Sequence, residues 1–142
     1  MNIELAKNTN APKTTKWIFY AKRLKGLVGY GITTLPFVKD VKNRDQFDQN
    51  TILVRNNSGF INGGMSRLGK ARHSEIPWKT NDEIQCSFDH LNGTFMMTKV
   101  SKNDSKCAVI ERDIPQGKIF YPFVAFSDPS EIANGDQIQV YF

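Results

Sequence analysis

The sequence is poor in the residues that most often carry catalysis or bind metal. It has only two cysteines, Cys86 and Cys107, and two histidines, His73 and His90. The cysteines do not form a short-spaced pair typical of a disulfide scaffold or a zinc site. Both histidines lie in loop-like stretches, and no signal in the sequence indicates that either is brought together with a nucleophile and an orienting acid as a catalytic triad requires. We therefore expect no enzyme activity, no metal and no cofactor, and we expect both cysteines to be reduced thiols.

Long apolar runs are also missing. No stretch approaches the roughly 20 apolar residues that a membrane helix needs. No charged-then-apolar signal segment opens the chain, and no apolar stripe with helical period extends over three turns. We therefore expect no membrane partner, a cytoplasmic or nuclear location, and few helices.

What the sequence does contain indicates one strand-rich domain. The 142 residues are 39% hydrophobic, with 10 Phe, 4 Tyr and 2 Trp for a core and 10 Gly and 6 Pro for loops. The net charge of +5 comes from small scattered groups, such as Lys22, Arg23 and Lys25. Such groups favour a solvated surface over a nucleic-acid site.

Period-two patterns and turn residues predict the strands. Residues 1–15 are polar and are predicted to be a flexible N-terminal arm or a partial edge strand, and residues 16–142 to be the domain. Ile138, Val140 and Phe142 are expected to share one face. Asn92-Gly93 predicts a hairpin with a two-residue type I′ turn. The strands are predicted at 17–22, 27–32, 51–55, 60–61, 83–88, 94–100, 119–126 and 137–142.

Several of these segments resemble the SPRY (B30.2) family. Residues 78–89, WKTNDEIQCSFD, are similar to the signature W-x-x-G-D-x-I-G-C-x-x-D, and NGTFM follows at 92–96. IFYPFV at 119–124 is similar to the family's L-Y-P-A-V strand. KWIF at 16–19 and VGYGI at 28–32 resemble its Y-W-E-V and V-G-V-G-V strands. The resemblance covers roughly residues 16–142.

The chain departs from the family pattern at three places. Asn81 stands for the glycine before Asp82, and Gln85 for the glycine before Cys86. The family's F-x-x-N-G after the hairpin is replaced by residues 98–102, TKVSK. We expect Trp78 to pack across the end of the sandwich, because of its place in the signature ahead of an alternating strand, and we expect Asp82 to close a turn.

The resemblance implies an all-β fold, a two-sheet antiparallel β-sandwich of the concanavalin-like jelly-roll kind. It implies a protein-interaction module that recognises a protein or short peptide through loops at one end, with no catalytic residues. The family's binding loops correspond to Thr34, Leu35, Pro36 and Phe37 and to Asp128 and Pro129. Alternatively, Leu35 and Phe37 cap the core.

The resemblance also implies a monomeric domain of a larger protein or assembly, such as the targeting part of a ubiquitin ligase or a signalling scaffold. Two other functions remain open. A glycan-binding, lectin-like sandwich would need a polar concave face with exposed aromatic rings beside Asn and Asp. Nucleic-acid binding through the basic loops would weaken steeply with added salt.

Overall fold

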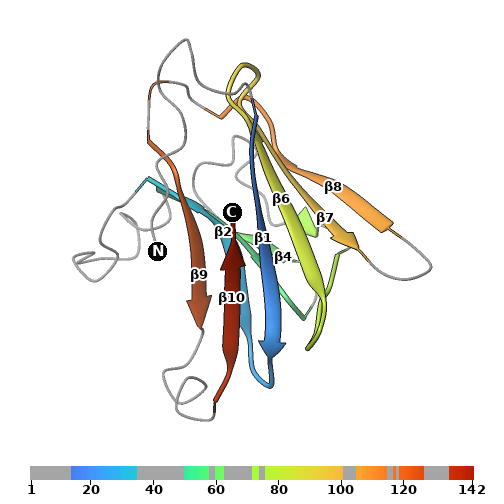
Figure 1. Cartoon of the computed structure of the whole chain (residues 1–142). Helices are drawn as coiled ribbons and strands as arrows, with labels where there is room; N and C mark the ends of the chain where they lie inside the picture. Colours follow the sequence, from blue (N-terminus) through green and yellow to red (C-terminus); the bar gives the residue numbers. More distant parts are fainter. Residues whose placement is uncertain are drawn as a thin grey trace.

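The computed structural model describes residues 14–34, 50–57, 60–62, 72–73, 76–100, 105–114, 117, 119–126 and 135–142 (Figure 1). These residues form two antiparallel sheets that face each other, so the predicted β-sandwich is confirmed. Sheet A has the order β10 (Gln137–Tyr141), β1 (Thr14–Arg23), β6 (Glu83–Asp89), β7 (Thr94–Val100) and β8 (Ser105–Glu111). Sheet B has the order β5 (Arg72–His73), β4 (Phe60–Asn62), β3 (Thr51–Arg55), β2 (Val28–Thr33) and β9 (Tyr121–Phe126).

The first strand shows how alternation builds the sandwich. Trp17, Phe19 and Ala21 of β1 are buried, while the residues between them are partly exposed. Successive side chains of a strand point to opposite faces, so one face of β1 enters the core. The strand begins at Thr14, slightly before the predicted boundary, and residues 1–13 lie outside the described part of the chain.

Aromatic rings cross the core from one sheet to the other. Phe95 of β7 stacks on Trp17 at a centroid distance of 6.0 Å, and Phe19 stacks on Tyr30 of β2 at 4.5 Å. Tyr30 in turn stacks on Trp78 at 4.4 Å. Offset stacking adds to the hydrophobic contribution of such large buried rings. Sheets A and B are therefore joined through one continuous aromatic core.

The hairpin between β6 and β7 is confirmed, but the predicted turn type is wrong. The last pair of the ladder is Asp89 with Thr94, which leaves a four-residue connection, 90–93. Gly93 has a φ of 63°, whereas a type I′ turn also needs a positive φ at Asn92, and Asn92 does not have one. The carboxylate of Asp89 organises this connection instead.

Two features of the sheets differ from the sequence-based predictions. β8, Ser105–Glu111, was not predicted, because its first three residues are all exposed and do not alternate. Phe142, expected beside Ile138 and Val140, lies beyond the end of β10 and is half exposed. Ile138 and Val140 do pack against the core. No helix in the described segments is long and apolar enough to cross a membrane.

Candidate functional site

The structure describes one of the six predicted binding residues. Thr34 follows β2 and is half-buried; its backbone N–H donates to the Asn50 carbonyl at 2.9 Å and its hydroxyl to Asn50 Oδ1 at 2.8 Å. These two bonds tie the start of the loop after β2 to the start of β3. Leu35, Pro36, Phe37, Asp128 and Pro129 lie outside the described residues.

The two predicted binding loops leave opposite ends of the sandwich. β2 and β9 are antiparallel, with Thr33 opposite Tyr121 and Val28 opposite Phe126. The two pairs are five residue steps apart along β2, which corresponds to about 17 Å at the usual rise of a strand. The last residue of β2 and the last residue of β9 are therefore not brought together. This corrects the expectation that both loops start from one end.

A connection of sheet A lies at the same end as Thr34. Phe120, which precedes Tyr121, contacts Phe88 of β6 with ring centroids 5.0 Å apart. The 90–93 turn follows directly after β6, and Gly93 accepts a hydrogen bond from the Ile114 N–H at 2.9 Å. We call this region, made of Thr34, Asn50, the 90–93 turn and residues 112–114, the Thr34 end; its 90–93 turn is at the top of Figure 1.

Leu91 is the exposed apolar side chain of this end. Its exposed fraction is 63%, the largest among the exposed large hydrophobic residues of the described chain. The turn that carries it is held by Asp89, whose Oδ1 accepts hydrogen bonds from the backbone N–H groups of Leu91 and Asn92 at 2.9 and 3.1 Å. The Asn92 side-chain amide donates to Asp89 Oδ2 at 3.0 Å. Leu91 was not predicted as a binding residue, although an apolar residue directly before Asn-Gly was a usable signal.

These hydrogen bonds also act on the Asp89 carboxylate. The backbone and side-chain N–H groups of Asn92 stabilise its charged form and hold the pKa of Asp89 below its ordinary value, with a further contribution from Leu91. The turn is therefore kept in one conformation by a group that is ionised at neutral pH.

His90 braces the same turn against β1. Its Nε2 lies 2.7 Å from the Thr15 hydroxyl, and its ring meets Phe88 edge-on at 5.0 Å. Partial burial lowers the pKa of His90, and the nearby Asp89 charge opposes part of that effect. His90 is accordingly a neutral, packed hydrogen-bonding group at neutral pH. The Thr34 end therefore has an exposed apolar side chain, Leu91, on a turn that the contacts of His90 hold in place.

A groove lies on the outer face of sheet A, apart from the Thr34 end. It is a half-open groove of about 380 Å³ whose rim includes the half-exposed rings of Tyr141 and Phe142. Lys16 is its only charged lining residue, and no Asn or Asp lines it among the described residues. The combination that the glycan alternative required is thus absent from this groove. The lining residues are Lys16, Trp17, Ile18, Gln85, Cys86, Ser87, Thr98, Tyr141 and Phe142.

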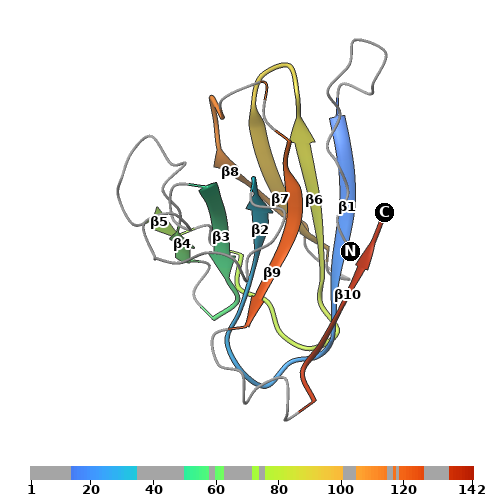
Figure 2. The ribbon, with the colours of Figure 1, turned by 90° about the vertical axis from the view of Figure 1, so that its left-hand side faces the viewer.

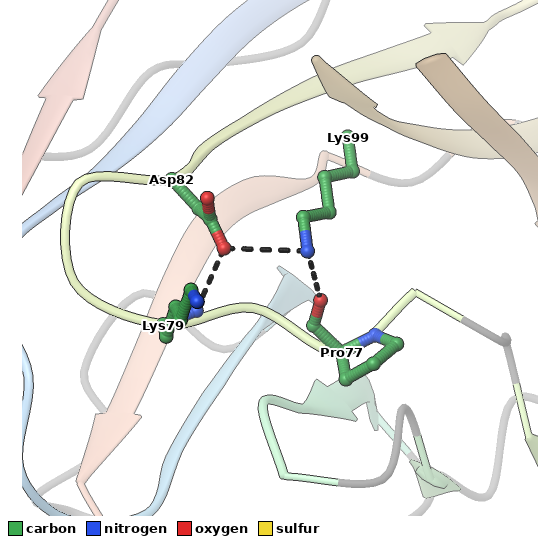
Figure 3. Close-up of polar contacts among 4 residues, drawn as sticks. All are labelled: Pro77, Lys79, Asp82 and Lys99. Atoms are coloured by element: carbon green, nitrogen blue, oxygen red, sulfur yellow. Dashed lines mark hydrogen bonds and ion pairs between the residues drawn. The ribbon is translucent and has the colours of Figure 1, made fainter. Parts of the chain in front are cut away.

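Asp82 and Trp78, two residues of the signature segment 78–89, have structural roles. Asp82 Oδ2 accepts a hydrogen bond from the Lys79 backbone N–H at 2.9 Å and lies 3.3 Å from Lys99 Nζ (Figure 3). Lys99 Nζ also donates to the Pro77 carbonyl at 2.8 Å. Asp82 therefore closes the turn before β6, as predicted, and Trp78 is buried as expected.

The thiols are free and separate. Cys86 is buried in β6, and desolvation raises the pKa of its thiol well above the ordinary value, so it stays protonated. Cys107 is exposed on β8. Within the described part of the chain, no group of three His, Cys, Asp or Glu side chains is arranged to hold a metal ion.

No protein-family model matches the sequence, and no curated protein matches it. Among solved structures, the chain is similar to the SPRY domain of human HERC1, with 21% identity and a TM-score of 0.64. The match covers 91% of this chain and 74% of that one. The resemblance inferred from the signature segments is thereby confirmed at the level of the fold: the chain has the fold of a SPRY domain.

Proposed function

We propose that the chain is a protein-interaction module that binds a short peptide segment through the Thr34 end. The observation that carries this proposal is Leu91, an exposed leucine on a turn held by three hydrogen bonds to Asp89. An apolar anchor on an already ordered turn loses little conformational entropy when a partner binds. The likeness to the SPRY domain of human HERC1 supports the same general class of function.

The loop after β2 supplies the rest of the proposed surface. Thr34 is fixed to Asn50 at this end, and Leu35, Pro36 and Phe37 follow it in the sequence. Asp128 and Pro129 are not part of the proposed surface, because β9 ends opposite Val28 at the other end of the sandwich.

The larger setting is part of the same proposal. The module serves as the targeting part of a larger assembly, such as a ubiquitin ligase or a signalling scaffold, in the cytoplasm or nucleus. The free thiols of Cys86 and Cys107 suit a reducing compartment. Imaging of the tagged chain in cells tests the location.

Selection of peptide ligands from a displayed random library tests the binding site. We expect Leu91→Asp to lower the affinity of selected peptides at least about tenfold, because a charge replaces the apolar anchor. Val100→Asp is the matched control, since Val100 is 37% exposed and lies at the opposite end of β7. Circular dichroism first establishes that both variants are folded.

Two results would contradict the proposal. One is that peptides bind the Leu91→Asp variant as tightly as the wild type. The other is that Val100→Asp weakens binding equally, which would show a general effect of added charge. The double variant Leu35→Asp/Phe37→Asp tests the loop after β2 in the same assay.

A further inference from the structure

Within the described residues, the four edges of the two sheets differ in how they are protected. An edge strand presents unpaired backbone N–H and C=O groups, and natural proteins guard such edges with proline, charged side chains, irregular pairing or short length. In sheet B, β9 contains Pro122, and β5 has only two residues. In sheet A, β8 carries Lys106, and its pairing with β7 is irregular between Phe95 and Met96.

β10 has only one of these protections, an irregularity in its pairing with β1 between Ala21 and Arg23, at the Gln137 end of the strand. Its five residues, QIQVY, include no charge, no proline and no glycine. Isoleucine, valine and tyrosine are residues that favour strands. β10 pairs with β1 on one side and is the outermost strand of sheet A among the described residues, as Figure 2 shows.

The register with β1 assigns the side chains of β10 to two faces. Ile138 lies opposite Ala21 and Val140 opposite Phe19, and both pack at the margin of the core, where they remain half-buried. Gln139 and Tyr141 are on the outer face, where the Tyr141 hydroxyl donates to Gln139 Oε1. Tyr141 is 50% exposed. The edge therefore offers incompletely covered apolar groups on both faces.

We propose that β10 pairs antiparallel with β10 of a second copy of this chain, about a twofold axis at Gln139. In that register Gln139 lies opposite Gln139 of the second copy, and each Ile138 lies opposite Val140 of the other chain. Each Gln137 lies opposite Tyr141 of the other chain. A twofold interface requires such a self-complementary surface.

The strand pattern favours a second copy over an unrelated peptide. Polar and apolar residues alternate so that the strand reads alike in both directions around Gln139, with apolar pairs inside and amide or aromatic pairs outside. No charged side chains meet along β10, although each chain carries a net charge of +5. Directly opposed side chains on neighbouring strands are the unit of sheet stabilisation, so the two Ile138–Val140 pairs favour this register.

The dimer is expected to be weak. A five-residue ladder buries less than the approximately 1,200 Å² at the lower limit of standard stable interfaces. Association should therefore depend on concentration. Sedimentation equilibrium over a concentration series measures it, and we expect the wild type to show a reversible monomer–dimer equilibrium.

Charged substitutions of Gln139, the residue at the twofold axis, test the register. Gln139→Lys and Gln139→Glu should each be monomeric, because like charges then face each other across the axis. An equimolar mixture of the two variants should associate again, because the substituted side chains have opposite charges. Gln85→Lys is the matched control, since Gln85 is an exposed glutamine on the outer face of β6, away from the edge; it should dimerise like the wild type.

The outcomes are decisive in both directions. Dimerisation of the wild type, loss in each single variant and recovery in the mixture support the proposal. A wild type that stays monomeric up to millimolar concentration overturns it. So does a Gln139→Lys variant that dimerises like the wild type, or a mixture that stays monomeric, because either result excludes pairing about Gln139.

Discussion

At the scale of single residues, Gly29 and Gly31 lie on the same strand, but they differ in the space available for a side chain. A Cβ at Gly31 would lie 1.7 Å from the Ile52 carbonyl oxygen, so β3 and β2 would have to separate. The nearest atoms to a Cβ at Gly29 would belong to the Leu53 side chain, at 3.5 Å, an ordinary van der Waals contact. We expect Gly31→Ala to lower the free energy of unfolding by about 3 kcal/mol, the upper range for overpacking. Gly29→Ala should change it by less than about 1 kcal/mol.

Urea unfolding of the two variants measures this difference. Gly29→Ala is the control for the general effect of adding a methyl group to β2. Equal stability of the two variants would show that the approach of β3 to Gly31 does not restrict the residue at this position. The pattern VGYGI at 28–32 does not by itself indicate which of its two glycines is approached by the backbone of the neighbouring strand.

Asn81 shows why a departure from a family signature can preserve the fold. Its φ is 73°, in the left-handed region where glycine is favoured and asparagine is the commonest alternative. The signature glycine is therefore replaced by the residue type best able to keep this backbone conformation. The Asn81 N–H donates to the Ala21 carbonyl at 2.7 Å, and its side chain accepts from the Tyr20 hydroxyl at 3.1 Å. Both bonds join the turn to β1.

At the scale of elements, the 90–93 turn should respond to acid through Asp89. The pKa of Asp89 is lowered in the folded state, so its carboxylate contributes stability above the unfolded pKa, and this contribution is lost as pH falls through the folded-state pKa. We expect amide protection at Leu91 and Asn92 to remain constant down to the ordinary carboxyl value of 3.8 and to fall below it. Hydrogen exchange measured against pH tests this expectation.

Asp89→Asn is the informative control for the turn. It should reduce protection at the same two amides at neutral pH and remove the dependence on acid. Loss of protection in the wild type near pH 5 would contradict the assignment to Asp89, because a lowered pKa places the transition on the acid side of the ordinary value.

The elements also show which parts of the site the sequence predicts. Alternation and Asn92-Gly93 were enough to predict β6, β7 and their hairpin, because those signals are local. β8 was not predicted, because it has no alternating pattern of its own. Its place in the sheet depends on pairing with β7, for example of Val109 with Met96. The separation of the two predicted loops follows from the antiparallel register of β2 and β9. Register is a long-range property, so the sequence pattern did not reveal it.

At the scale of the whole molecule, Asp136, which directly precedes β10, connects sheet A to the segment between β1 and β2. Its carboxylate is buried and accepts hydrogen bonds from the backbone N–H groups of Lys25 and Gly26 at 2.9 and 3.0 Å. Those residues join β1 of sheet A to β2 of sheet B. Asn56 holds the same link from sheet B, since its side chain accepts from the Val28 N–H and donates to the Gly26 carbonyl.

Asp136→Ala should therefore destabilise the entire sandwich and not only β10. The change leaves two backbone donors without their acceptor, and we expect a loss of about 2–3 kcal/mol in the free energy of unfolding. Gln137→Ala, at an exposed neighbour on the same strand, should cost less than about 0.5 kcal/mol. Because aromatic stacking joins the two sheets, circular dichroism and tryptophan fluorescence should report one coincident transition in Asp136→Ala. Two separate transitions would show that β10 unfolds independently, and that the link held by Asp136 stabilises an edge instead of the whole core.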